Sequence, residues 1–141
     1  MIRVVVDTNI VVSALLQRQG VPAQVLLLAL NHPGLQLCVS GEIYAEYEDV
    51  VSRPKFKRSE AEREHILRAI REHALWVKPT DKLRVCSDPD DNIFLECAAT
   101  ARAHYLVTGN VKHFPAQWSD TRILTARQFV DLAGTPGLLD R

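Results

Sequence analysis

The sequence predicts an α/β fold with three layers (α/β/α) and a central parallel sheet of four to five strands. Short apolar runs rich in β-branched residues, such as IRVVV at residues 2–6, alternate with longer stretches that have apolar residues at helical spacing. Strands that alternate with helices form a parallel sheet with helices on both of its faces. The chain has 141 residues, a length typical of one domain, so we expect a single domain over residues 1–141.

The N-terminal part of the chain predicts two strands and three helices. After the first strand, two apolar stretches follow at the spacing of a helix face, and Gly20 and Pro22 separate them. Ser40 follows a second strand-like run and can cap the helix after it. The expected elements are strand 2–6, helices 9–20 and 23–32, strand 35–39 and helix 41–52.

The rest of the chain predicts three more helices. Ser59 and Glu62 form a capping-box pattern, as do Thr125 and Gln128, and each pattern opens a helix. The expected elements are a helix from 59 to 73, strand fragments 75–77 and 83–86, a helix from 91 to 104, strands 105–109 and 121–124, and a last helix through 133.

Composition limits the partners and the location that can be expected. The 17 basic and 17 acidic side chains give a formal net charge of zero, so any nucleic-acid binding must use a local basic patch. No stretch reaches the ~18 apolar residues of a membrane span, so we expect no membrane segment. The three cysteines form no C-x-x-C pair, as expected for reduced thiols in the cytoplasm.

Acidic and amide side chains are expected to gather at one edge of the sheet. Ligands of open parallel sheets bind beyond the carboxyl ends of the strands. Asp7 and Asn110 directly follow expected strands, whereas Glu46 and Asp91 lie near the starts of two helices. A structural alternative exists for each acid, since Asp7 and Asp91 can cap helices and Glu46 can be a solvated helix residue. One cap needs one carboxylate, however, and DPDD at 88–91 supplies three.

Carboxylates that lie close together attract a hard cation. Two of them ~4 Å apart repel each other by about 4 kcal/mol at an effective dielectric constant of 20. Oxygen ligands without thiols predict Mg²⁺ or Mn²⁺, the ions of phosphoryl-transfer chemistry. Asn110 adds a neutral oxygen. Ser13, about one helical turn beyond Asn9, can hold a water or a phosphate, or can simply pack against a neighbouring helix.

Three segments resemble the PIN domain (PilT N-terminus). They are VVVDTNIVVSALL, EIYAEYEDVVSRPKF and DPDDNIFLECAATARAHYLVTGN, and the resemblance extends from residue 2 to about residue 129. The nearest branch holds the toxin components of bacterial toxin–antitoxin pairs related to VapC-type toxins. The resemblance implies a Mg²⁺- or Mn²⁺-dependent ribonuclease, often a homodimer, that acts on RNA. It also implies an antitoxin protein that inserts a segment into the active-site groove.

The same resemblance assigns roles to individual residues. Asp7, Glu46 and Asp91 match the three metal-binding acids, and Asp88 is the second choice for the third acid. Asn9 belongs to the first motif, and Ser13 follows it as an auxiliary candidate. Where family members often carry a fourth acid, in or after T-G-D, this chain has Asn110. Three residues further on, where some relatives have aspartate before phenylalanine, it has His113.

Two basic segments can contact the phosphates of a nucleic acid. Arg53 and Lys55 lie in RPKFKR beside an aromatic residue that can stack on a base, although the segment can equally be a solvated loop. Lys112 and His113 follow Asn110 and are expected at the edge of the acidic site.

Two other functions stay open. A catalytically silent PIN-like module that binds RNA or a protein is consistent with the missing fourth acid. A small-molecule phosphohydrolase with Asp7 as covalent nucleophile is disfavoured, because Asn9 stands where that chemistry usually uses a second aspartate.

Overall fold

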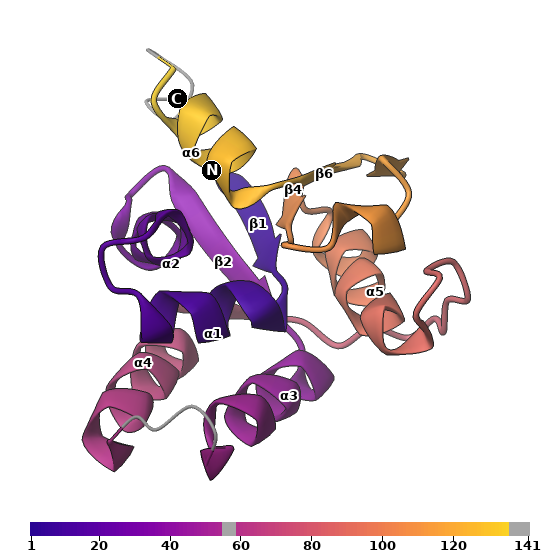
Figure 1. Ribbon diagram of the computed structural model, residues 1–141. Helices are drawn as coiled ribbons and strands as arrows, with labels where there is room; N and C mark the ends of the chain where they lie inside the picture. The colour runs from indigo at the N-terminus through magenta and orange to yellow at the C-terminus, as the bar shows by residue number, and fades with distance from the viewer. Residues whose placement is uncertain (55–58, 136–141) are drawn as a thin grey trace.

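The computed structural model describes residues 1–54 and 59–135, and within these residues a six-stranded sheet has the order β3-β2-β1-β4-β6-β5 (Figure 1). The strands are β1 (Ile2–Val6), β2 (Leu35–Val39), β3 (Leu75–Trp76), β4 (Tyr105–Val107), β5 (Gln117–Trp118) and β6 (Thr121–Leu124). The helices are α1 (Thr8–Leu16), α2 (Val21–Asn31), α3 (Gly41–Val51), α4 (Glu60–His73), α5 (Asn92–Ala101) and α6 (Ala126–Ala133). Two short 3-10 helices are η2 (Pro89–Asp91) and η3 (Val111–His113).

The predicted three-layer α/β arrangement with a parallel sheet centre is confirmed. β1 pairs in parallel with β2 and β4, and β4 pairs in parallel with β6. Val4, Val5 and Val6 have no exposed surface. Successive side chains of a strand point to opposite faces, so both faces of the sheet must be covered at β1. α5 packs on β1, β2 and β4, while α2 packs on β2 and contacts α1 and α6.

The edges of the sheet differ from the prediction. Six strands are present rather than four to five, because β3 and β5, each two residues long, extend the sheet at its two edges. β5 pairs antiparallel with β6, so the expected parallel direction is wrong at this edge. The chain reverses through the two residues between these strands, and Ser119 adopts a φ of 52° there. The fragment expected at 75–77 corresponds to β3, whereas the two-residue pairing of β5 left too little periodic pattern in the sequence to predict a strand.

Helix starts follow the predicted caps, with one difference. The Ser40 hydroxyl accepts a bond from the Ile43 N–H at 3.2 Å, and Thr125 with Gln128 forms a complete capping box. Ser59 accepts from the Glu62 N–H, as predicted. The Glu62 carboxylate does not complete the predicted box, because it pairs with Arg18 at 3.2 Å. This ion pair joins α4 to the segment between α1 and α2.

The helix expected over 91–104 is shorter, and the strand expected over 83–86 does not form. α5 ends at Ala101 because Arg102 adopts a left-handed conformation with φ 53°. The Arg3 guanidinium donates to the carbonyl oxygens of Ala101 at 2.7 Å and Arg102 at 3.0 Å, which satisfies two of the last carbonyl groups of the helix. Within 83–86, side chains of α5 bind backbone N–H groups instead of a neighbouring strand.

Among the described residues, no individual helix is long and apolar enough to cross a membrane. Only α1 and α2 taken together satisfy the criteria of length and composition, and they meet at an angle of 110°. The three cysteines are free thiols, with Cys38 and Cys97 buried and Cys86 partly buried.

Candidate functional site

Asp7 lies buried at the carboxyl end of β1 and does not cap α1. It occupies the N-cap position, but its side chain makes no capping hydrogen bond. Its Oδ2 accepts a bond from the Thr108 hydroxyl at 2.6 Å, just beyond the end of β4. Only 4% of the residue is exposed. The pKa of Asp7 is raised to about 6, mainly by burial; the bond from Thr108 opposes this rise and repulsion from Asp91 contributes to it. The capping alternative is therefore wrong for Asp7.

Glu46 reaches the same edge of the sheet from α3. The Thr8 hydroxyl, next to Asp7, donates a hydrogen bond to Glu46 Oε2. Burial raises the pKa of Glu46, the bond from Thr8 lowers it, and repulsion from Asp7 raises it further. The Tyr47 hydroxyl, fully buried, donates to the carbonyl oxygen of Val6 and so fixes α3 against the end of β1. Glu46 is partly buried, so it is not the solvated helix residue of the structural alternative.

Asp91 joins Asp7 and Glu46 from the start of α5. It is the last residue of η2 and the N-cap of α5, and its side chain makes no capping bond. Burial raises the pKa of Asp91, and repulsion from Asp88 and Glu46 adds to the rise. Asp7, Glu46 and Asp91 thus lie near enough to raise one another's pKa values, although they come from segments far apart in the sequence.

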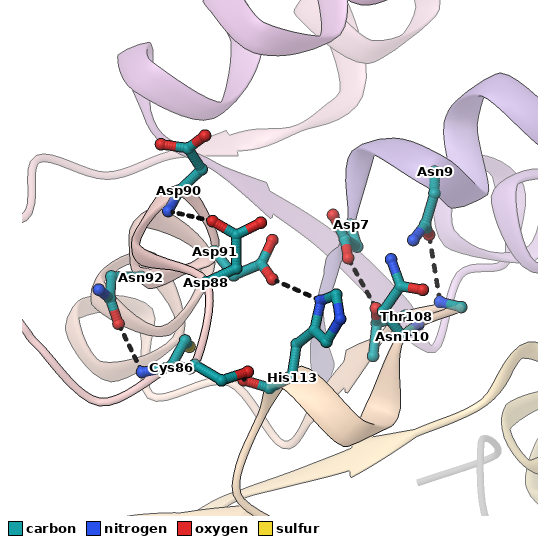
Figure 2. Close-up of polar contacts among 12 residues, drawn as sticks. Asp7, Asn9, Cys86, Asp88, Asp90, Asp91, Asn92, Thr108, Asn110 and His113 are labelled. Atoms are coloured by element: carbon teal, nitrogen blue, oxygen red, sulfur yellow. Dashed lines mark hydrogen bonds and ion pairs between the residues drawn. The ribbon is translucent and has the colours of Figure 1, made fainter.

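The other two acids of the DPDD turn have different roles. Asp88 caps η2, because its Oδ1 accepts from the Asp90 N–H at 3.0 Å. Figure 2 shows the Asp90 carboxylate pointing away from that of Asp7. Asp91 Oδ2 instead faces His113, with 3.3 Å between it and Nδ1 (Figure 2). Asp88, Asp91 and His113 each offer one ligand atom, and these atoms all lie within 4.8 Å of one another.

Two polar residues of α5, which the sequence reading missed, hold the segment before the DPDD turn. Asn92, buried, accepts bonds through Oδ1 from the N–H groups of Val85 at 3.1 Å and Cys86 at 2.9 Å. Glu96, also buried, accepts from the Leu83 N–H at 2.9 Å. Their spacing of four residues on the buried face of an apolar helix was the available signal, since buried polar side chains nearly always have partners.

Residues after β4 complete this edge of the sheet. Asn110 is exposed, and its backbone N–H donates to the Thr108 hydroxyl at 3.0 Å. Asn9 Oδ1 accepts from the Gly109 N–H at 3.1 Å, so this side chain links the start of α1 to the loop. Ser13 is exposed, and no contact described for its side chain connects it with the acids.

The candidate phosphate-binding residues are spread over two segments. Arg53 is exposed and pairs with Asp49 at 3.1 Å, and it lies near enough to Glu46 to lower the pKa of that acid. Lys112 is exposed on η3 beside His113. Lys55 lies outside the described residues, as do the other residues of 55–58.

The largest hollow described lies away from the acidic site. A hollow of about 700 Å³ lies between α1, α2 and α4, and its lining includes none of the predicted acids. The carboxylates of the site are gathered instead where β1 and β4 end. Carboxylate oxygens with one imidazole nitrogen form a donor set that a divalent cation can accept.

Comparisons with known proteins agree with the fold and with the sequence motifs. The family model of the PIN domain matches residues 3–112. The uncharacterized protein MJ1680 of Methanocaldococcus jannaschii is 30% identical over 112 residues, which are 77% of this chain and 71% of that protein. A chain in the crystal structure of VapBC2 from Rickettsia felis, bound to a DNA fragment from their promoter, superposes with a TM-score of 0.56 at 19% identity. That match covers 88% of this chain and 98% of the other. Because the family model covers most of its length, this chain belongs to the PIN domain family.

Proposed function

We propose that this protein is a metal-dependent endoribonuclease and the toxin of a type II toxin–antitoxin pair. The observation that supports the proposal most directly is the meeting of Asp7, Glu46 and Asp91, whose charges raise one another's pKa values. Keeping such acids together without a cation costs free energy, so a site of this kind has a use for one. Membership of the PIN domain family supports the same activity.

In this proposal Asp7, Glu46 and Asp91 hold Mg²⁺ or Mn²⁺, and Asn110 assists them. A bound ion would lower the pKa of a water and shield the charge of the phosphodiester. The hydroxyl groups of Thr8 and Thr108 orient the carboxylates of Glu46 and Asp7 through the hydrogen bonds described above. These bonds use one oxygen of each carboxylate.

Contacts with RNA and with protein partners follow from the same proposal. Lys112, exposed next to the site, and Arg53, near Glu46, would meet phosphates, and Lys55 belongs to the same basic segment. The structural neighbour comes from a VapBC complex, which supports an antitoxin as partner. We include in the proposal a single domain over residues 1–141, a homodimer, and a cytoplasmic location in which the three free thiols remain reduced.

The test is RNA cleavage by the purified full chain with Mn²⁺, compared with Asp7→Asn. Loss of one metal-binding carboxylate should reduce cleavage by at least ~100-fold while circular dichroism shows an unchanged fold. Asp131→Asn, the same chemical change at an exposed position on α6, is the matched control and should keep full activity.

Two outcomes would contradict the proposal in different ways. Undiminished cleavage by Asp7→Asn would remove this residue from the mechanism. Tight RNA binding by the wild-type chain without cleavage at any Mn²⁺ concentration would favour the silent binding module instead.

A further inference from the structure

The imidazole of His113 lies beside the carboxylates of Asp88 and Asp91. The loop after β4, residues 108–116, contains no Asp or Glu, and it brings an imidazole to the acids. Nδ1 of His113 lies 3.3 Å from Asp91 Oδ2, and one ligand atom from each of His113, Asp91 and Asp88 lies within 4.8 Å of the other two. The side chain is 44% exposed, so solvent and ions can reach it.

The backbone on both sides of this imidazole is anchored. The His113 N–H donates to the Asn110 carbonyl oxygen at 2.9 Å, which closes η3. The His113 carbonyl oxygen accepts from the Ser87 N–H at 3.1 Å and from the Ser87 hydroxyl at 3.5 Å. Because Ser87 immediately precedes Asp88, these bonds tie η3 directly to the acidic turn. The backbone that carries the ring therefore has a defined place relative to Asp88 and Asp91.

Asp88 and Asp91, the acids beside the imidazole, each have a carboxylate oxygen that can bind a metal ion. Asp91 makes no capping bond although it stands at the N-cap of α5. Asp88 uses Oδ1 to cap η2, which leaves Oδ2 on the same carboxylate as a second possible donor. Two ligand atoms each ~2.1 Å from an ion and at right angles to each other lie ~3.0 Å apart. The separation of 3.3 Å between His113 and Asp91 is close to this value.

We infer that His113 is a metal ligand of the acidic site and gives it a preference for transition ions such as Mn²⁺ over Mg²⁺. The chemical reason is the donor type, since imidazole nitrogen binds first-row transition ions well, whereas Mg²⁺ strongly prefers oxygen ligands and water. The inference rests on the proposed function only in requiring a divalent cation at this site.

Pulsed electron paramagnetic resonance of Mn²⁺ bound to the untagged full chain tests the ligation directly. A bound imidazole gives a ¹⁴N coupling, which we expect in the wild type and in His65→Ala, the control at an exposed histidine of α4. The coupling should be lost in His113→Ala, and the Mn²⁺ affinity should fall about tenfold while the Mg²⁺ affinity stays nearly constant. The exposure of His113 makes this variant compatible with folding, which thermal denaturation checks.

A second variant replaces the imidazole by a carboxylate instead of removing the ligand. His113→Asp restores a carboxylate at this position, so the ratio of Mn²⁺ to Mg²⁺ affinity, measured by calorimetry, should fall about tenfold from its wild-type value. An unchanged ratio, a wild-type complex without ¹⁴N coupling, or a coupling that survives in His113→Ala would overturn the inference.

These results separate the inference from the proposed function. Metal-dependent RNA cleavage without ¹⁴N coupling would refute the role of His113 and leave the nuclease intact. A ¹⁴N coupling without RNA cleavage would support the metal ligand and count against the nuclease.

Discussion

Replacing Asp7 by asparagine should make the metal-free protein more stable, even though it removes the proposed activity. The pKa of Asp7 is raised from 3.8 to about 6, mainly by burial. The folded state therefore holds the proton more tightly than the unfolded state. Stability falls as the pH rises from the unfolded to the folded pKa, and the full cost is present above the folded pKa.

The size of the effect follows from the shift. A difference of 6 − 3.8, about 2 pKa units, corresponds to roughly 3 kcal/mol at neutral and higher pH. At pH 5 the folded state is still mostly protonated, so the cost is about half as large. An amide at position 7 carries no charge to desolvate, and its carbonyl oxygen can still accept the bond from Thr108.

Urea denaturation in the presence of EDTA measures this prediction. At pH 8 the free energy of unfolding of Asp7→Asn should exceed that of the wild type by about 3 kcal/mol, and the gap should shrink by about half at pH 5. Saturating Mn²⁺ should also shrink the gap at pH 8, because by mass action it stabilises the wild type, with its full set of ligands, more than the variant. A variant that is no more stable than the wild type at pH 8 would refute the reasoning.

Two further substitutions test the supports of the site. Asn92→Ala leaves the N–H groups of Val85 and Cys86 without their acceptor, so the free energy of unfolding should fall by about 2 kcal/mol in urea denaturation. A loss below about 0.5 kcal/mol would show that water replaces the amide. Thr8→Val removes the bond that lowers the pKa of Glu46. The acidic limb of the pH profile for Mn²⁺-dependent RNA cleavage should then move to higher pH, and an unmoved limb would contradict the assigned role of Thr8.

The sequence was sufficient to predict the centre of the fold because its periodic patterns are long. The run IRVVV and the capping residues Ser40 and Thr125 lie where the structure has β1, α3 and α6. Shorter or non-local features were not predictable in this way. β5 is two residues long, and the segment 83–86 is held by side chains of α5 rather than by a strand partner.

The same difference between local patterns and non-local contacts applies to the residues of the site. Asp7, Glu46 and Asp91 could be selected because their chemistry and their places at the ends of elements point to one edge. Their hydrogen-bond partners could not be predicted from the sequence. Thr108, for example, is far from Asp7 in the sequence and meets it only through the pairing of β1 with β4. The contact of His113 with Asp91 depends in the same way on the loop after β4.

The Thr108 hydroxyl, at the end of β4, links Asp7 to the loop through two hydrogen bonds of fixed direction. A hydroxyl has a single proton, and here its oxygen accepts the Asn110 N–H while that proton goes to Asp7. The loop is thus coupled to Asp7 through main-chain atoms of residue 110, whatever side chain stands there. Exchange of an acid for an amide at this position can therefore alter what the site binds without disturbing how Asp7 is oriented.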